Sequence, residues 1–425
     1  MKKYSLIILL LISAACAEHR PAGPPVLRES SPESAGFSTA RLARLDSAMA
    51  RWTRDGWMNG AVAFVARNGK IVYHKAAGYN NLKTKEPLQR DGIFRIASQT
   101  KAITSVAIMI LYEEGKLLLE DPVAKFIPTF ANAVVLDKFN AKDTTYTTVP
   151  AVRQITLRDL LTHTSGIGYA QIGSPEANAI YAKSHITAGL DVHGDTLVAA
   201  MTRLGKLPLM QQPGKSFLYG LNIDVLGAIV EIVSGLSLDE FFQQRIFAPL
   251  GMKDTYFNIP EEKASRLVNF FMPDSTGQLA VPKSALGGDP QFPLRKKTYF
   301  SGGGGLSSTI TDYAIFLQML LNGGQYNGVR ILSRNAVRMM TMNQIGDLML
   351  DQNKFGLGFG LVTEESSRMA PPQAGTYSWG GAFSTVYWVD PKEEMVVSFY
   401  RQMWGPHGAD IDQTFKVLVY QALND

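Results

Sequence analysis

Residues 94–104, FRIASQTKAIT, change from strand-like apolar residues to small, helix-compatible ones around Ser98 and Lys101. If a helix begins at Ser98, the spacing of three residues places the serine hydroxyl and the lysine amine on one face. The pair is then either a nucleophile beside its base or an ordinary helix start with a solvated lysine. By itself the stretch favours the ordinary helix start, and its context has to decide.

The position of Ser98 and Lys101 favours the interpretation as a nucleophile beside its base. A serine at a strand-to-helix junction has a helix N-terminus and free backbone N–H groups beside it, which can stabilise an oxyanion. A serine hydroxyl needs a base within hydrogen-bond reach, and a lysine serves only where burial or a neighbouring charge lowers its pKa. Lys101 lies on an otherwise apolar helix that we expect to run to Glu114 and to be capped by Gly115.

The composition is that of an ordinary soluble globular protein. The chain has 425 residues, of which 46% are hydrophobic and 19% are charged, with a formal net charge of +5. Basic residues are dispersed among acidic ones, so no stripe for nucleic acid is expected.

The N-terminus reads as an export signal. Lys2 and Lys3 precede an apolar run that is too short to span a membrane, and small residues lead to Cys16, the only cysteine. Cys16 stands where a bacterial lipoprotein is cleaved and acylated, although Ser13 fits that pattern imperfectly and an ordinary cleavage site is the alternative. We expect a signal peptide over 1–16, a Pro- and Ser-rich tether over 17–37, and a protein that is periplasmic or lipid-anchored to the bacterial envelope.

The order of predicted elements indicates an α+β fold. A helix over 38–54 precedes a β-hairpin that turns at Asn68-Gly69, and the C-terminal part carries antiparallel strands and a last helix over 411–423. The middle is helical and loop-rich, with an amphipathic stretch over 222–233. We expect a single domain over 38–425 with an antiparallel sheet built from both termini (about 38–97 and 295–425), an inserted helical lobe (about 98–294) and a cleft at the seam.

Two further segments carry candidate site residues. In PGKSFLYGLNIDVLG, residues 213–227, Tyr219 stands in a turn and is either a phenolic acid–base or a packed aromatic. In YSWGGAF, residues 377–383, Trp379, Gly380 and Gly381 interrupt a strand and mark either a close ligand or a bulge.

The sequence gives little support for a phosphate-binding loop, an α/β-hydrolase nucleophile or a metal site. The four glycines 302–305 are expected to form a flexible loop before a helix, and GKS at 214–216 lacks the first glycine of a phosphate loop, because Leu209 stands there. There is no Gly-x-Ser-x-Gly elbow. The six histidines show no close metal spacing, and His163 is expected in a structural turn. No metal or cofactor is therefore predicted.

Ser98-x-x-Lys101, the Tyr219 turn, LRDLLTHTSGI and the late glycine-containing strand together resemble the serine β-lactamase and penicillin-binding-protein superfamily. The resemblance implies that Ser98 is acylated, that Lys101 is its base or proton relay, and that Tyr219 takes the place of the tyrosine in a Tyr-x-Asn motif. It also implies an oxyanion hole from the backbone N–H groups of Ser98 and Ala382.

Two departures from the family pattern affect the expected substrate. Leu221 stands at the third position of Tyr-x-Asn, with Asn222 one residue late, and Trp379 replaces the Lys or His of the Lys/His-Thr-Gly motif. Loss of that cation weakens recognition of penicillin or peptide carboxylates, while an indole favours neutral apolar acyl groups. The sequence is similar to the family VIII carboxylesterases, so we expect a small-molecule ester as substrate, membrane contact only through a lipid on Cys16, and no nucleic acid. The alternatives are a β-lactamase or D-Ala-D-Ala-type peptidase acting on an amide, and a non-catalytic acyl-binding sensor.

Overall fold

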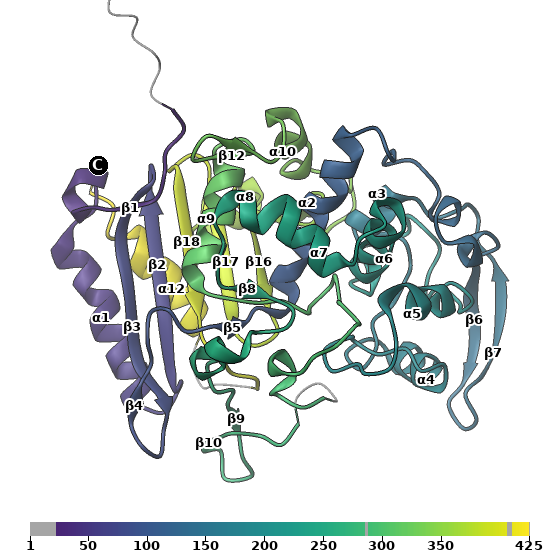
Figure 1. Cartoon of the computed structure of the whole chain (residues 1–425), viewed down its shortest axis with the longest axis horizontal. Helices are drawn as coiled ribbons and strands as arrows, with labels where there is room; N and C mark the ends of the chain where they lie inside the picture. Colours follow the sequence, from purple (N-terminus) through teal and green to yellow (C-terminus); the bar gives the residue numbers. More distant parts are fainter. Residues whose placement is uncertain (1–22, 285–287, 406–409, 425) are drawn as a thin grey trace, which may run out of the picture.

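The computed structural model describes residues 23–284, 288–405 and 410–424 (Figure 1). The signal peptide and Cys16 predicted from the sequence lie outside these residues. No helix in the described ranges is both long enough and apolar enough to cross a membrane.

A nine-stranded sheet, antiparallel except at one edge, forms one side of the molecule (Figure 1). Its strand order is β1-β3-β2-β18-β17-β16-β15-β14, with β4 on β3, so strands from both ends of the chain meet where β2 pairs with β18. The α+β class and the sheet built from both termini are confirmed. The strands are β1 (Arg28–Glu29), β2 (Gly60–Arg67), β3 (Lys70–Asn81), β4 (Glu86–Pro87), β14 (Lys354–Phe355), β15 (Gly360–Leu361), β16 (Tyr377–Gly381), β17 (Thr385–Asp390) and β18 (Met395–Tyr400).

The β2–β3 hairpin turns at Asn68 and Gly69, as predicted, with φ angles of 54° and 72°. The tether expected over 17–37 is shorter than the sequence suggested, because β1 pairs in parallel with β3 and a 3-10 turn follows at Pro32–Ala35. The end of this segment therefore forms an edge strand at Arg28–Glu29 and a turn at Pro32–Ala35.

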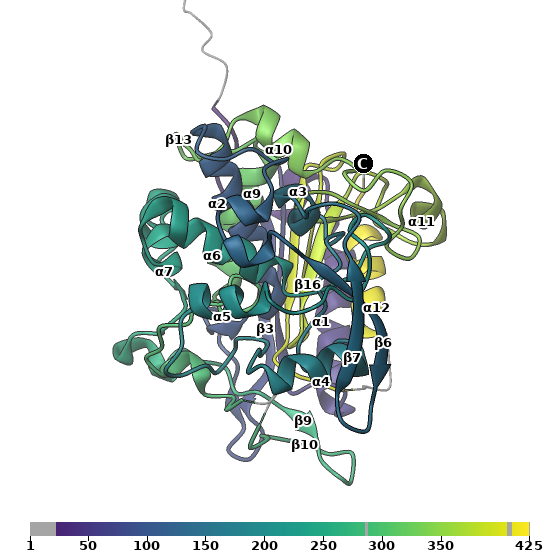
Figure 2. The ribbon, with the colours of Figure 1, turned by 90° about the vertical axis from the view of Figure 1, so that its right-hand side faces the viewer.

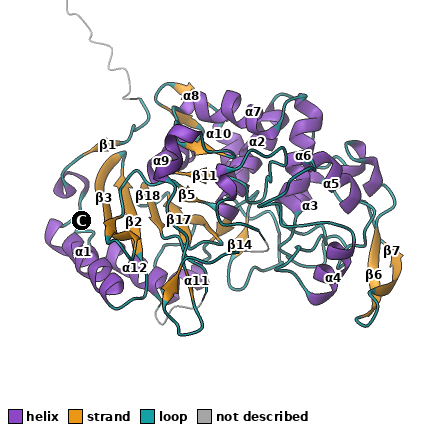
Figure 3. Ribbon diagram, turned by 60° about the horizontal axis from the view of Figure 1, so that its bottom comes forward, coloured by secondary structure: helices purple, strands orange, loops and turns teal. Residues whose placement is uncertain are grey.

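Alternate residues of the central strands face two separate apolar cores. Val62 and Phe64 of β2 face one core, and Ala63 and Val65 face the other. The second core is closed by α1 (Thr39–Arg54) and α12 (Ile411–Tyr420), which lie together on one face of the sheet (Figure 3). Phe415 of α12 stacks on Phe399 of β18 with ring centroids 4.2 Å apart.

The opposite face of the sheet carries the helical part of the chain (Figures 1 and 3). Its apolar residues form one continuous core with that face. The helices are α2 (Thr100–Glu113), α3 (Leu157–Leu161), α4 (Pro175–Lys183), α5 (Leu197–Leu204), α6 (Asn222–Ser234), α7 (Leu238–Phe242), α8 (Ala248–Leu250), α9 (Ile310–Leu321), α10 (Arg334–Met340) and α11 (Glu364–Met369).

A two-stranded hairpin, β6 (Val134–Asn140) and β7 (Thr145–Pro150), lies at the far end of the helical part, as two views show (Figures 1 and 2). The sequence did not predict it. Every residue of β7 is exposed, so its polar, threonine-rich sequence carries no apolar alternation that would indicate a strand.

Short strands tie the middle of the chain back to the sheet side. β11 (Ser307–Ser308) pairs with both β5 (Phe94–Arg95) and β8 (Thr255–Tyr256), and Phe271 bridges to Met403. Two-residue strands β9 (Met272–Pro273) and β10 (Leu279–Ala280) pair with each other, as do β12 (Gln325–Tyr326) and β13 (Val329–Arg330). The lobe boundaries given above remain a prediction.

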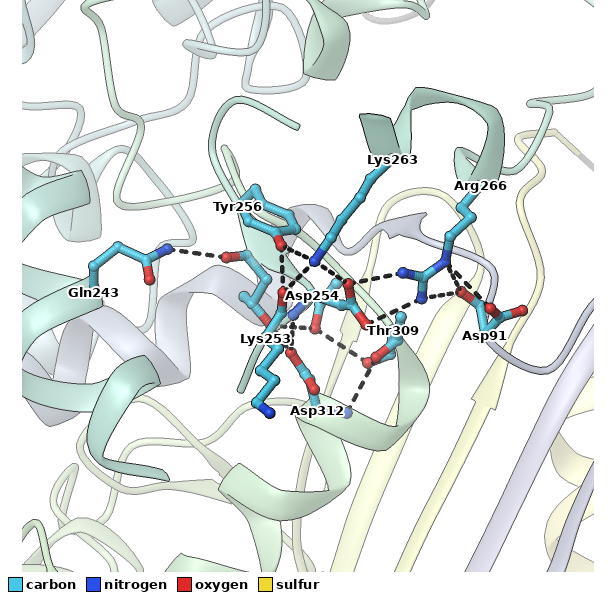
Figure 4. Close-up of polar contacts among 11 residues, drawn as sticks. Asp91, Gln243, Lys253, Asp254, Tyr256, Lys263, Arg266, Thr309 and Asp312 are labelled. Carbon is cyan, nitrogen blue, oxygen red and sulfur yellow. Dashed lines mark hydrogen bonds and ion pairs between the residues drawn. The ribbon is translucent and has the colours of Figure 1, made fainter. Parts of the chain in front are cut away.

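A cluster of ion pairs with one further buried carboxylate lies at this junction, and we call it the Asp254 cluster: Asp91, Asp254, Lys263, Arg266 and Asp312 (Figure 4). Asp254 accepts from Lys263 and Arg266, each at 2.8 Å, and Arg266 also bonds to Asp91. Asp312, at the start of α9, accepts from the backbone N–H of Asp254 at 2.6 Å. Burial raises the pKa of Asp312 to about 6.

Candidate active site

Ser98 lies on a rigid turn between β5 and α2. The sequence predicted an α-helix from Ser98, but a 3-10 turn at Ala97–Gln99 comes first and α2 begins at Thr100. Ala97 has a φ of 42°, a strained value for a residue with a side chain. The turn is held from outside, because the Tyr313 hydroxyl donates to the Gln99 carbonyl at 2.8 Å.

The structure brings Ser98, Lys101 and Tyr219 together. Lys101 Nζ lies 3.2 Å from Ser98 Oγ, and the Tyr219 hydroxyl lies 2.7 Å from the same oxygen. Lys101 is only 2% exposed, so its interpretation as a solvated surface lysine is wrong. A buried amine and a phenol thus share one partly buried serine oxygen, as general-base activation of a nucleophile requires.

Lys101 has further neighbours that the sequence analysis did not identify. Its Nζ donates to the Gly303 carbonyl at 2.6 Å and lies 3.5 Å from the Tyr169 hydroxyl. It also lies 4.7 Å from the ring centroid of Tyr219 and 5.4 Å from that of Tyr169, both within cation–π range. Aromatic faces and a carbonyl therefore surround the ammonium group.

The aromatic wall behind Ser98 is continuous. The ring of Tyr219 lies 4.8 Å from His163, 5.4 Å from Tyr169 and 5.6 Å from Trp379. Tyr219 is therefore not an isolated packed aromatic: it joins the nucleophile to the Trp379 strand. Gly220 follows it because a Cβ there would come within 2.0 Å of the Ile167 carbonyl oxygen.

The end of β16 packs against the Ser98 turn. A Cβ on Gly381 would lie 2.3 Å from the Ile96 carbonyl oxygen, so only glycine allows this approach. Gly380 continues the regular register of β16 with β17, opposite Val386. Ala382 packs in the same apolar cluster as Ala97. The oxyanion hole from the N–H groups of Ser98 and Ala382 stays a prediction, and this proximity is compatible with it.

Asn222 points away from the nucleophile. Its side-chain nitrogen donates to His163 Nδ1 at 2.9 Å, and its oxygen accepts from Ser165. Because Gly220 N–H also reaches Nδ1, the His163 proton belongs on Nε2. Burial, aided by the charge of Lys101, lowers the pKa of His163 well below its usual value, so this ring stays neutral. The φ of 55° at His163 confirms the predicted turn.

The glycine-rich segment 302–305 is buried, so its description as a flexible loop is wrong. A Cβ on Gly302 would lie 2.7 Å from the Ile223 carbonyl oxygen, and one on Gly303 would lie 2.3 Å from Asp224 Oδ2. The glycines let the chain pass between α6 and α2 and place the Gly303 carbonyl on Lys101. This contact and Asp224 escaped the sequence analysis, although Asp224 stands only five residues after Tyr219.

A cavity and an apolar cluster adjoin the site. A cavity of about 540 Å³ extends from Tyr219 and Tyr169 between β6 and α4, within the usual size of a small-molecule site. In addition, an apolar cluster includes Ala97, the residue before Ser98. The cavity lining includes Leu136, Asp137, Phe139, Glu176 and Met210. The apolar cluster comprises Ala97, Leu190, Phe270, Phe292 and Phe383, with Met272, Ala382 and Trp404 against it.

Within the part of the chain that the structure describes, no group of three or more His, Cys, Asp or Glu side chains is placed to hold a metal ion.

Comparison with known proteins agrees with this architecture. The Beta-lactamase family profile matches residues 43–421. Esterase EstB of Burkholderia gladioli is 30% identical over 84% of this chain and 90% of its own length, and a putative D-alanyl-D-alanine carboxypeptidase of Escherichia coli K12 is 28% identical over 93% and 89%. The solved structure of EstCE1, described as a hydrolase with promiscuous acyltransferase activity, superposes with a TM-score of 0.76 at 25% identity over 90% of this chain and 99% of that one.

Proposed function

This chain belongs to the Beta-lactamase family, and from that we propose that it is a serine hydrolase that cleaves neutral carboxylic esters through an acyl-enzyme on Ser98. One observation carries the proposal: Ser98 Oγ lies within hydrogen-bond reach of both the buried Lys101 amine and the Tyr219 hydroxyl. Relatives in this family include esterases and carboxypeptidases, so the choice of ester rests on the residues around the serine.

In the first half of the reaction, Ser98 Oγ attacks the carbonyl carbon of the ester. Its proton passes to the Lys101–Tyr219 pair, and the carbonyl oxygen becomes an oxyanion held by the N–H groups of Ser98 and Ala382. The carbon–oxygen bond to the alcohol then breaks, and the alcohol leaves with a proton from Tyr219. Positioned acid–base chemistry contributes about 10²–10⁴-fold, and each oxyanion donor about 10²–10³-fold.

In the second half, water attacks the acyl carbon and gives its proton to the same pair. The bond to Ser98 Oγ breaks, the serine recovers its proton, and the carboxylic acid is released. The same two groups thus act in both halves with their roles reversed.

The surroundings of Ser98 support a neutral, apolar substrate. Trp379 stands where the related antibiotic-binding pattern has a cation, and its ring packs 5.3 Å from Phe355 and 5.6 Å from Tyr219. The cavity between β6 and α4 carries Asp137 and Glu176 among apolar residues. Two carboxylates there oppose a substrate that bears its own carboxylate, as penicillins and peptide C-termini do.

The test compares two chromogenic substrates on the purified protein. We expect p-nitrophenyl butyrate to be hydrolysed with a kcat/KM at least about 100-fold above that for a chromogenic cephalosporin, and Ser98→Ala to hydrolyse neither. Efficient turnover of the cephalosporin with inert esters would overturn the ester preference and leave a β-lactamase.

A second candidate is a D-alanyl-D-alanine-type carboxypeptidase, favoured by the Escherichia coli relative that bears that name. Release of D-alanine from a peptide ending in D-Ala-D-Ala distinguishes it, because an esterase of this kind leaves that peptide intact. D-alanine release by wild type, lost in Ser98→Ala, would establish the peptidase.

We also propose that the protein is exported and that Cys16 is acylated, on the grounds of the apolar leader and the cysteine at its end. Metabolic labelling with an alkyne fatty acid tests this, with Cys16→Ala as the control. Label in wild type and none in the variant is expected, and an unlabelled, freely released wild type would indicate ordinary cleavage instead.

A further inference from the structure

Asp224 contacts the segment that holds Lys101. It lies in the first turn of α6, fully buried, and its Oδ1 accepts from Ser301 Oγ at 2.6 Å and from Gly303 N–H at 3.2 Å. The carbonyl of the same Gly303 accepts from Lys101 Nζ at 2.6 Å. A chain of contacts therefore runs from the carboxylate through one glycine to the amine beside Ser98.

The second oxygen of Asp224 is unusual. Oδ2 is buried and has no hydrogen-bond partner among the described residues. A buried carboxylate with an unpaired oxygen costs free energy unless a nearby positive charge compensates it. Burial raises the pKa of Asp224, and the charge of Lys101 opposes that rise. Lys101 is thus a counter-charge of Asp224 without touching it.

From this arrangement we propose that Asp224 is a positioning residue: it fixes the Gly303 carbonyl on Lys101 and supplies the buried negative charge that balances the lysine. The inference rests on the proposed function, because it concerns the base of the same serine. Asp224 itself does not contact Ser98.

This role accounts for the altered motif around Tyr219. The Asn222 amide is engaged by His163 and Ser165, and Leu221 offers no polar group. Asp224 is the polar side chain of this segment that reaches the lysine side of the site, through Gly303. A side chain at position 303 would collide with Asp224 Oδ2, at 2.3 Å, so the glycine and the aspartate require each other.

His163, Tyr169 and Tyr299 are further titratable side chains near Lys101 and Asp224. His163 is neutral because burial lowers its pKa, and burial raises the pKa of Tyr169 well above its usual value, with Tyr219 and Asp224 adding to the rise. Tyr299, on the segment before Gly303, is also buried, and burial and then Asp224 raise its pKa. Asp224 is therefore the acidic side chain whose contacts reach Lys101, through Gly303.

The experiment is the pH dependence of p-nitrophenyl butyrate hydrolysis by the full chain carrying Asp224→Asn. Asparagine keeps an oxygen that can accept from Ser301 and Gly303 N–H, so the variant removes mainly the charge. It also places an amide N–H₂ group where Oδ2 now lies, so kcat is expected to fall about tenfold with KM within about twofold, because the base is disturbed and the substrate contacts are not. Loss of the negative charge disfavours the ammonium form, so the acidic limb of the profile should move to lower pH by about one unit.

Two further variants test whether the charge of Asp224 or its hydrogen bond to Ser301 is responsible. Asp312→Asn makes the same chemical change at another buried aspartate, in the Asp254 cluster, and should leave the pH profile where it is in wild type. Ser301→Ala keeps the Asp224 charge and removes one hydrogen bond, so kcat should fall about threefold to tenfold without a shift of the acidic limb. A folded Asp224→Asn whose acidic limb stays in place would overturn the proposal and leave Asp224 a structural residue.

If Asp224→Asn does not fold, Ser301→Ala carries the test: unchanged kcat there would contradict the positioning role. Failure of the proposed function is distinguishable from either result, because wild type would then hydrolyse no ester at all. Turnover by wild type with unaltered variants would reject only the role of Asp224.

Discussion

Two polar clusters in this molecule place their cations in different surroundings. In the Asp254 cluster the central carboxylate faces two opposite charges: Asp254 bonds to Lys263 and Arg266, each at 2.8 Å (Figure 4). Burial acts to raise the pKa of Asp254, but the two cations outweigh it and hold that pKa below its usual value. Around Ser98, by contrast, Lys101 faces hydroxyls, rings and a carbonyl, and its nearest carboxylate is reached only through Gly303.

The Asp254 cluster is arranged to stabilise the fold, whereas the groups around Ser98 are arranged to exchange protons. A neighbouring carboxylate stabilises the protonated form of a cation. An amine held against a serine and a phenol, by contrast, can exchange protons with them. Asp224 Oδ2 and His163 Nε2, which have no hydrogen-bond partner among the described residues, lie near the reactive cluster. The following substitutions break or sharpen this contrast.

The largest effect is expected for Lys101→Met, which keeps the bulk of the side chain and removes the amine. kcat/KM for p-nitrophenyl butyrate should fall about 10²–10⁴-fold, and the residual rate should lose its increase with pH. Stability should fall, because buried Asp224 loses its counter-charge and the Gly303 carbonyl loses its donor. Activity within tenfold of wild type would show that Tyr219 alone serves as the base.

Arg266→Met makes the corresponding change in the Asp254 cluster, and the opposite outcome is expected. Unfolding in urea should show a loss of about 2–3 kcal/mol, because Asp254 then faces a single cation in a half-buried site. Ester hydrolysis should be unchanged. The exposed pair Arg54–Asp55 provides the control: Arg54→Met should alter stability by no more than about 0.5 kcal/mol. Equal losses in the two variants would mean that burial of the pair does not matter.

Asp312 makes the Asp254 cluster sensitive to pH. Its pKa is about 6 in the folded protein and about 3.9 for an unperturbed aspartate, so the folded state binds the proton more tightly. This group's contribution to stability is present below about pH 4 and is lost as pH rises to about 6. Relative to wild type, Asp312→Asn should therefore gain about 2 kcal/mol between pH 4 and pH 7 in urea unfolding. A difference that does not vary with pH would remove Asp312 from the account.

The smallest effect is expected at Trp379. Trp379→His restores an ionisable side chain to the strand beside Tyr219, and the ratio of cephalosporin to ester kcat/KM should rise about tenfold. Most of that change should come from the cephalosporin, measured at pH 6 where the histidine is partly charged. An unaltered ratio would indicate that Trp379 does not select between the two substrates.

The contrast between the clusters also explains what the sequence could predict. Ser98, Lys101 and Tyr219 are polar residues in apolar or turn surroundings, and their order along the chain resembles a known family, so both the fold and these three neighbours were predictable. The hairpin at Asn68-Gly69 and the helices at both termini follow from local turn chemistry and apolar periodicity.

What escaped prediction depends on contacts between distant segments. Gly303 lies 202 positions from Lys101, and its backbone carbonyl carries no side-chain signal. Asp224 looks like an ordinary first-turn acid of a helix, which is a common and favourable place for one. The β6–β7 hairpin forms part of the cavity through Leu136 and Phe139 but is polar along β7, so neither its strands nor its place beside Tyr219 could be inferred.

The central claim is that Ser98 is the nucleophile, and one measurement addresses it directly. Wild type and Ser98→Ala are treated with a fluorophosphonate, and the mass of the intact protein is recorded. Wild type should gain one phosphonyl group, located on the peptide that contains Ser98, and the variant should gain none. An unlabelled wild type would favour a non-catalytic acyl-binding protein, and equal labelling of the variant would place the nucleophile elsewhere.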